Sequence, residues 1–304
     1  MKILDKKMTF GVIVGTRGFF NPRLAIEGRR QLLAKLNALK YSYVILPVKA
    51  TAHQAVETRA DAKRCAALFQ EHRDRIDGVI VVLPNFGDEL GIVETLDLAR
   101  LDVPVLVQAC SDRLDAVDVA GRRDAFCGKL SVCNNLYQYG IPFTDTREHT
   151  CDIDGDAFGA DLDFFARVCR VVRGLRRARI GAVGARPAAF QTVRFSEKLL
   201  QDSGITVVPV DLSEIISQAR QLDDRAGSVR KKLSEIEKYG SIPSRIDPQA
   251  VLKQAKLSAV LERWMTENEL DASAVQCWTS IQNNYGCATC LSMSLMGEKH
   301  MPSA

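Results

Sequence analysis

The chain has 304 residues, of which 46% are hydrophobic and 26% are charged, proportions typical of a globular protein with sizeable cores. Its 41 basic and 37 acidic residues give a formal net charge of +4, which is too balanced to indicate nucleic acid or an anionic membrane as a partner. We find neither a secretory signal pattern nor an apolar run near the ~20 residues of a transmembrane helix. Nine cysteines, an odd number, favour reduced thiols. We therefore expect a cytoplasmic protein.

The first half of the chain alternates short apolar runs with helical patterns. Residues 9–15 form a continuous apolar run, which indicates a strand covered on both faces. Pro22 suits the first turn of the helix that follows. Further strands are expected at 43–48, 77–83 and 103–108, and further helices at 54–72 and 88–100. Strands separated by single helices predict a parallel, doubly wound sheet.

The alternation starts again in the second half, after a less regular stretch at 111–150 and a long helix at 158–177. The expected strands lie at 178–184, 205–210 and 272–278, and the expected helices at 190–202, 212–239 and 247–268. We therefore predict an α/β protein with two tandem Rossmann-like domains, at 1–175 and 176–304. The second domain is expected to be incomplete at its C-terminal end.

A glycine-containing loop follows the first strand of each half. Arg17, in Gly15-Thr16-Arg17-Gly18, offers a planar fork of donors to a hydroxylated or anionic ligand. Arg186 holds the matching place in the second half. Ligands of α/β sheets lie outside the carboxyl ends of strands, so both arginines are candidate ligand contacts. A tight turn in the first loop, and domain packing in the second, are the alternatives. Neither loop has the glycine spacing of a nucleotide phosphate site.

Polar and aromatic residues also follow two later strands. Asn85 could exchange hydrogen bonds with sugar hydroxyls, and Phe86 could cover an apolar ring face, whereas Asp88 is better read as a helix cap. Gln276 and Trp278 end the last predicted strand.

The pair Cys287 and Cys290 has no second ligand pair at zinc spacing. We therefore expect two cysteines on a buried helix face.

Taken together, these loops and strand ends resemble the L-fucose/L-arabinose isomerase family, in particular its isomerase-like branch, over the whole chain. Members of that family have two N-terminal α/β domains and a C-terminal domain, and they interconvert aldoses and ketoses with a divalent metal, usually Mn²⁺. The resemblance implies that the metal polarises the oxygens at C1 and C2 while a carboxylate base moves a proton through a cis-enediol. It also implies a homo-oligomer, a trimer or hexamer, whose subunits complete one another's sites.

The resemblance assigns substrate-binding positions but no catalytic or metal-binding ones. Arg17 matches a substrate contact, and Asn85 and Phe86 match a loop that reaches a neighbouring subunit's site. Gln276, Trp278 and Gln282 match pocket positions of the second domain. In the family the metal ligands follow the stretch equivalent to 296–304. We therefore expect the catalytic C-terminal domain to be absent from this chain, and the chain alone to be inactive.

Two functions remain open from the sequence. The first is a metal-dependent sugar isomerase of which this chain is the N-terminal portion. The second is a non-catalytic, two-lobed sugar-binding protein. Both require the loops that carry Arg17 and Trp278 to converge on one cleft. An NAD-dependent oxidoreductase is poorly supported, because the glycine fingerprint is missing.

Overall fold

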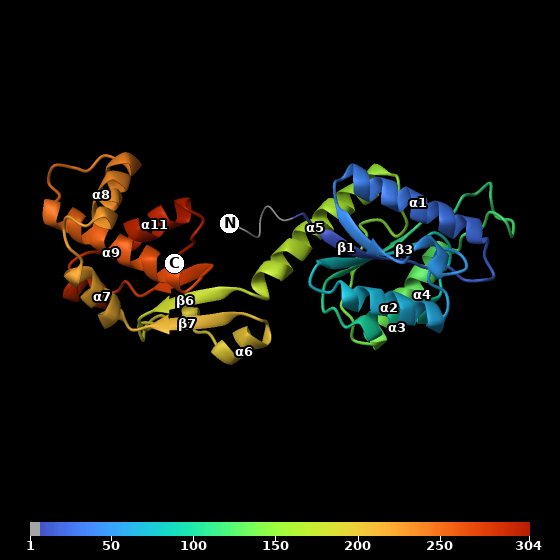
Figure 1. Ribbon diagram of the computed structural model, residues 1–304, viewed down its shortest axis with the longest axis horizontal. Helices are drawn as coiled ribbons and strands as arrows, with labels where there is room; N and C mark the ends of the chain where they lie inside the picture. Colours follow the sequence, from blue (N-terminus) through green and yellow to red (C-terminus); the bar gives the residue numbers. More distant parts are fainter. Residues whose placement is uncertain (1–6) are drawn as a thin grey trace. The chain divides into compact units, whose positions relative to one another are not determined.

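The computed structural model describes residues 7–304, which form two compact units: one ends at Arg173 and the other begins at Gly174 (Figure 1). The start of the segment searched for a signal pattern, residues 1–6, lies outside this range. Within 7–304, no helix has the length and apolar character needed to cross a membrane.

The first unit is built around a five-stranded, all-parallel sheet with the order β2-β1-β3-β4-β5. Its strands are β1 (Thr9–Val14), β2 (Ser42–Ile45), β3 (Gly78–Leu83), β4 (Val105–Ala109) and β5 (Thr144–Asp145). Its helices are α1 (Pro22–Ala38), the 3₁₀ turn η1 (Val48–Ala50), α2 (Arg59–Glu71), α3 (Glu89–Ala99), α4 (Ala125–Gln138) and α5 (Asp156–Leu175), the last of which runs past the end of the unit.

Helices cover both faces of this sheet, as the continuous apolar strands predict (Figure 1). Phe10 and Val12 of β1 pack on one face against α1 and α5, where Phe165 stacks on Phe10 with ring centroids 5.7 Å apart. Ile13 points to the other face, which α2, α3 and α4 cover. Every residue of β1 is buried, as expected for a central strand whose two faces are both covered.

The second unit contains a smaller parallel sheet with the order β7-β6-β8. Its strands are β6 (Arg179–Val183), β7 (Thr206–Val210) and β8 (Ala272–Val275). Its helices are η2 (Gln191–Val193), α6 (Glu197–Asp202), α7 (Leu212–Gln221), α8 (Gly227–Tyr239), α9 (Pro248–Glu267), α10 (Ser280–Asn284) and α11 (Cys290–Glu298). The fold class predicted from the sequence, α/β with two parallel sheets, is confirmed.

The two faces of this smaller sheet are covered unequally. Gly181 of β6 lies directly under Trp264 of α9, where a Cβ would stand 2.6 Å from the indole ring, and Val183 packs in the same core. The opposite face carries Ile180 and Val207, which are only half-buried. The main core of the second unit therefore lies on the α7 and α9 side of its sheet.

The C-terminal segment packs against the cores of the second unit. Leu295 and Met296 of α11 are buried. After α11, Ser303 pairs in parallel with Ser273 of β8, and the Val275 amide donates to the Ala304 carbonyl at 2.7 Å. Residues 302–304 thus extend the small sheet beyond β8.

A four-residue ion network joins α8, α9 and the end of α11. Lys232, almost fully buried, pairs with Glu235 and Glu262. Lys299 approaches the same two carboxylates at 2.8 and 2.9 Å. Burial alone raises the pKa of each carboxyl, but hydrogen bonds from the two lysines outweigh it and hold both pKa values below 4.5. The network therefore ties the C-terminal segment to its neighbours by charge.

Four expected elements differ from those observed. The helix expected at 54–72 begins at Arg59, because Thr58 and Asp61 form a capping box there. The stretch 111–150, expected to be irregular, contains α4 and β5. The helix expected at 212–239 is interrupted after Gln221 and becomes α7 and α8, and the one expected at 190–202 is reduced to η2 and α6.

Candidate functional site

The candidate site of the first unit lies where the loops after β1 and β3 diverge. These strands are neighbours in the sheet, although the chain visits β2 between them. After β1 the chain forms β2 at one edge of the sheet. It then crosses back to the other side of β1, where β3, β4 and β5 follow toward the opposite edge. In sheets with this strand order, ligands usually bind outside the carboxyl ends of the two strands at which the chain reverses direction. Arg17, Asn85 and Phe86 all lie on these two loops.

Asn85 joins the two loops to each other. Its side chain is completely buried. Its Nδ2 donates to Thr16 Oγ1 at 3.0 Å, and its Oδ1 accepts from the Gly87 amide at 3.1 Å. Because its donor and acceptor atoms both have protein partners, Asn85 sets the relative position of the loops. Its role as a direct sugar contact stays a prediction.

Arg17 lies across the ring of Phe86, with its guanidinium carbon 4.5 Å from the ring centroid. Its ion pairs with Asp88 and Glu89 are long, at 3.9 and 3.8 Å, and its side chain is 34% exposed. The contact with the ring orients the guanidinium plane. Partly exposed ion pairs of this length contribute little to stability. Arg17 is thus held in place with N–H donors still available to a ligand.

Two further residues extend this stack, and sequence reasoning missed both. Phe86 stacks on Phe20, with ring centroids 5.8 Å apart and an interplanar angle of 21°. Arg122 lies over the ring of Phe20, at 5.7 Å from its centroid. The sequence contains a signal for Phe20, because it belongs to the same loop as Arg17. Nothing in the pattern around Arg122 places it over a loop about a hundred residues earlier.

The main chain of the Phe86 loop is enclosed by two helices that approach it through glycines. A Cβ on Gly28 of α1 would stand 2.4 Å from Pro84 Cγ. A Cβ on Gly128 of α4 would stand 1.8 Å from the Phe86 carbonyl oxygen. Arg123 also donates to the Pro84 carbonyl at 2.6 Å. Close packing therefore fixes the loop that carries Asn85 and Phe86.

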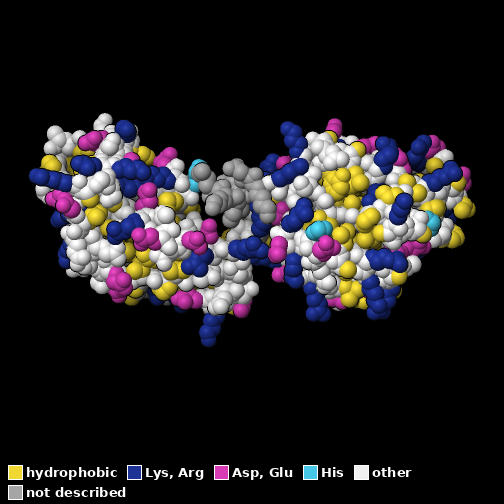
Figure 2. All heavy atoms as spheres, viewed as in Figure 1, with side chains coloured by type: hydrophobic (Ala, Val, Ile, Leu, Met, Phe, Trp, Pro, Cys, Tyr) yellow, Lys and Arg dark blue, Asp and Glu magenta, His cyan; other side chains and the backbone are white. Residues whose placement is uncertain are grey.

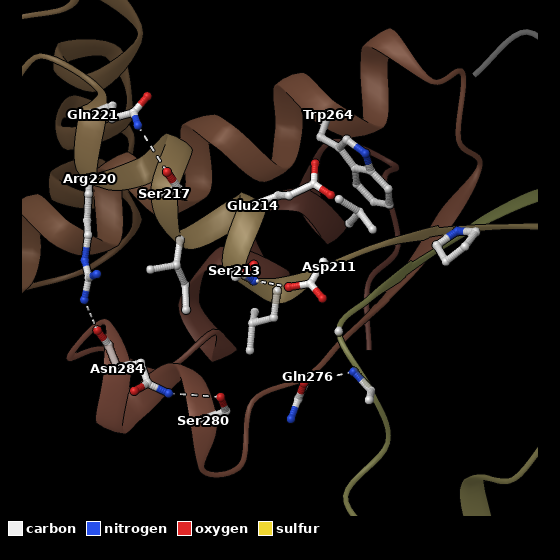
Figure 3. Close-up of a pocket in the computed structure, with 16 residues that line it drawn as sticks. Asp211, Ser213, Glu214, Ser217, Arg220, Gln221, Trp264, Gln276, Ser280 and Asn284 are labelled. Atoms are coloured by element: carbon white, nitrogen blue, oxygen red, sulfur yellow. Dashed lines mark hydrogen bonds between the residues drawn. The ribbon is translucent and has the colours of Figure 1, made fainter.

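The second unit contains an open groove of about 1140 Å³ at the carboxyl ends of its three strands (Figure 3). Gln276 follows β8, Asp211 lies between β7 and α7, and Ser280 and Asn284 come from α10. Glu214 and Arg220 of α7 complete much of the polar lining, while Trp264 and Ile216 provide apolar surface. A groove lined by hydroxyl, amide and carboxylate groups beside apolar surface suits a polyhydroxylated ligand.

Gln276 spans the crevice between β8 and β6. Its Oε1 accepts a hydrogen bond from the Ala185 amide at 2.9 Å (Figure 3). Gly184 has φ 75°, and a Cβ there would stand 2.4 Å from Gln276 Oε1, so only glycine fits that position. Among residues 7–304, Gln276 Nε2 has no hydrogen-bond partner, which leaves it available to a ligand in the groove.

Asp211 is a groove residue that sequence reasoning did not single out. Its Oδ1 accepts from the Ser213 amide at 2.7 Å and so caps α7. Hydrogen bonds from Ser213 lower the pKa of this carboxyl. Asp211 therefore stays ionised at neutral pH, with its second oxygen open to the groove. Its position directly after a predicted strand was the signal that could have found it.

The other three predicted residues of the second unit do not line the groove. Arg186 donates to the carbonyls of Pro187, Ala188 and Phe190, at 2.8 to 3.2 Å, so it folds its own loop. Trp278 is 60% exposed and lies against Phe190, with ring centroids 5.6 Å apart. Gln282 is exposed on α10. Arg17 and Trp278 belong to different units, and their shared cleft stays a prediction.

The cysteine pair differs from expectation. Cys287 precedes α11 and is half-buried, and Cys290 at the start of α11 is exposed. The two do not share a buried helix face, because the turn before α11 separates them. Burial raises the pKa of Cys287 to about 11, so this thiol is protonated at neutral pH.

The family resemblance implies a divalent metal, usually Mn²⁺. In the part of the chain that the structure describes, no three His, Cys, Asp or Glu side chains are grouped so that they could hold a metal ion. The described residues by themselves therefore do not fit a Mn²⁺ site.

The architecture is that of an α/β protein with two parallel sheets, each followed by loops at the carboxyl ends of its strands. Residues 11–176 match the sequence family described as the fucose/sulfoquinovose isomerase N-terminal domain, and the chain belongs to this family. It is 27% identical over 231 residues to the sulfoquinovose isomerases of Priestia aryabhattai and Priestia megaterium, covering 75% of this chain and 49% of each relative.

A third relative shows the same pattern. The sulfoquinovose isomerase of Alkalicoccus urumqiensis is 26% identical over 243 residues, which cover 78% of this chain and 52% of the relative. The chain therefore spans about half the length of the curated relatives it matches.

Proposed function

We propose that this chain supplies the sugar-binding half of a metal-dependent aldose–ketose isomerase. Its membership of the isomerase N-terminal family is the observation that carries the proposal. The names of its relatives support sulfoquinovose, a sulfonated aldose, as the first substrate to test. The residues proposed to contact the sugar are those predicted from the sequence: Arg17, Asn85, Phe86, Arg186, Gln276, Trp278 and Gln282.

The side chains of residues 7–304 suggest which steps of the reaction this chain performs. Arg17 offers oriented guanidinium donors, and Gln276 offers a free amide N–H in a polar groove. Both suit hydroxyl or anionic oxygens of a sugar. Among residues 7–304, no three His, Cys, Asp or Glu side chains are grouped to hold Mn²⁺. In this proposal a separate polypeptide segment supplies the metal site and the carboxylate base. This chain binds and orients the open-chain sugar.

A homo-oligomer, a trimer or hexamer in the cytoplasm, is part of the same proposal. Leu130 and Tyr137 lie on one face of α4 and are 58% and 81% exposed, and Leu114 on the preceding loop is 97% exposed. Hydrophobic side chains are visible over the same unit in Figure 2, where basic and acidic side chains are otherwise mixed. Exposed apolar surface of this kind supports contact with another protein surface.

Complementation tests the proposal. The chain is co-expressed with the C-terminal half of the Priestia aryabhattai relative, and ketose formation from sulfoquinovose and a panel of aldoses is measured with added Mn²⁺. The relative's own two halves are the positive control. We expect activity from the mixture and none from the chain alone. If the control halves are active together and no aldose is turned over in the mixture, the proposal is wrong.

A matched pair of variants tests the contribution of Arg17. Arg17→Gln should lower the turnover of the complemented enzyme at least tenfold, or about 1.4 kcal/mol of transition-state stabilisation. Arg23→Gln removes a nearby exposed arginine on α1 and should leave turnover unchanged. Equal effects of the two substitutions would exclude a specific role for Arg17.

The second candidate function is a sugar-binding protein without catalysis. The groove of the second unit, together with the lack of any metal-holding group among residues 7–304, favours it. Calorimetry with aldoses in EDTA separates the two functions. Tight, metal-independent binding with no turnover in the complemented mixture would support the binding protein.

A further inference from the structure

A second hollow lies beside the groove of the second unit. It encloses about 460 Å³ and is bounded by the end of α7, the first half of α9 and the end of α10. Arg220 and Asn284 line both hollows, and Arg220 Nη2 donates to the Asn284 carbonyl (Figure 3). Arg220 therefore stands at the boundary between groove and hollow.

The charges that line this hollow are unbalanced. Its cationic side chains are Arg220, Lys253 and Lys256, and its one carboxylate is Asp224. Lys256 forms an ion pair with Asp224, and its side chain is only 13% exposed. Within residues 7–304, neither Arg220 nor Lys253 has a carboxylate partner. The lining thus has a net charge of +2.

Lys253 and Lys256 both line the hollow, where an anion could contact their ammonium groups. Lys253 and Lys256 are three residues apart on α9, so they lie on the same side of that helix. Lys253 Nζ lies over Gly286, 3.0 Å from where a Cβ would stand, which places its ammonium group at the wall of the hollow. The amide side chains of Gln249 and Asn283 add neutral donors to the lining. Like charges that line one hollow repel one another, and a bound anion relieves that repulsion.

We infer that this hollow binds a small molecule carrying a tetrahedral dianion, chemically a phosphate monoester. Its volume lies within the range of small-ligand sites, about 300–1,000 Å³. A phosphate monoester carries a charge of about −1.5 to −2 at pH 7, which matches the lining, and its oxygens accept several hydrogen bonds at once. A sulfonate carries a single negative charge and leaves one positive charge uncompensated. The inference does not rest on the proposed isomerase activity.

Calorimetry on the full chain at low ionic strength tests this site with three probes: inorganic phosphate, glucose 6-phosphate and ethanesulfonate. We expect saturable binding of the two phosphates, weaker binding of ethanesulfonate, and affinity that falls as salt is added. Lys253→Gln should weaken phosphate binding at least tenfold, which corresponds to about 1.4 kcal/mol. Lys231→Gln, at an exposed lysine on α8, is the matched control and should have no effect.

A variant that is expected to bind phosphate more tightly separates loss of the site from general misfolding. Asp224→Asn removes the one carboxylate of the lining and should tighten phosphate binding, whereas structural damage would weaken it. Three results would each overturn the inference: no heat of binding with either phosphate, equal affinities for Lys253→Gln and Lys231→Gln, or ethanesulfonate bound as tightly as phosphate.

Discussion

Replacing Gly128 of α4 by alanine tests how the loop after β3 is held. The new Cβ would stand 1.8 Å from the Phe86 carbonyl oxygen and 2.5 Å from the carbonyl carbon. Carbon–oxygen contacts of this kind usually measure about 3.3–3.6 Å, so the carbonyl must move by roughly 1.5 Å to reach an ordinary contact. The obstacle is main chain, which no side-chain rotation can relieve.

The cost of that movement exceeds the gain in helix propensity. Alanine in place of glycine stabilises a helix by about 1 kcal/mol. Overpacking costs about 1–3 kcal/mol, and more when backbone must shift. We therefore expect Gly128→Ala to destabilise the first unit by about 2 kcal/mol, which lowers its Tm by about 4–8 °C. Displacement of Phe86 should also disturb the contact of its ring with Arg17.

Two optical probes separate the units. Both tryptophans, Trp264 and Trp278, belong to the second unit, so tryptophan fluorescence follows that unit while far-UV circular dichroism follows both. Gly128→Ala should shift one dichroism transition and leave the fluorescence transition in place. Gly174→Ala is the control, since a Cβ there meets nothing within 4 Å and should not destabilise. An unchanged dichroism transition for Gly128→Ala would refute the reasoning.

Three further predictions concern other parts of the structure. Asn85→Ala should destabilise the first unit by about 1–3 kcal/mol in urea unfolding, because the buried Thr16 hydroxyl and Gly87 N–H lose their hydrogen-bond partner; a change below about 0.5 kcal/mol would contradict the loop-joining role. The lowered pKa of Glu235 contributes stability that is present above pH 4.5 and lost as the pH falls through its folded value. Acid should therefore destabilise the second unit, as measured by tryptophan fluorescence during unfolding. Lys299→Met should make the stability of that unit depend less on pH. Iodoacetamide at pH 7.5 should label exposed Cys127 and spare Cys65, because burial raises the pKa of the Cys65 thiol to about 12. The labelled peptides are identified by mass spectrometry, and faster labelling of Cys65 than of Cys127 would contradict the prediction.

Strand positions were the most predictable part of this fold. The apolar run at 9–15 became β1 because a strand buried on both faces needs apolar residues throughout. Helix boundaries were less predictable where a cap or a break decided them. The capping box at Thr58 shortened α2. α4 was missed because its buried residues include Lys129 and Gly128, which do not form an apolar stripe.

The candidate site could be predicted only where local sequence determines it. Arg17 and Phe86 follow strands that are adjacent in the sheet, and the structure places their side chains in contact. Arg186 does not line the groove, because its guanidinium donates to carbonyls of its own loop; its role as a sugar contact stays a prediction. Arg122 and Arg220 act across long sequence separations, and no spacing rule indicates which surface a distant arginine reaches.

The hydrogen bond from Asn85 to Thr16 has a mechanical consequence. It links the turn after β1 to the turn after β3 through two buried side chains. Arg17 and Phe86, which follow Thr16 and Asn85 directly in the chain, therefore lie on turns that are tied to each other.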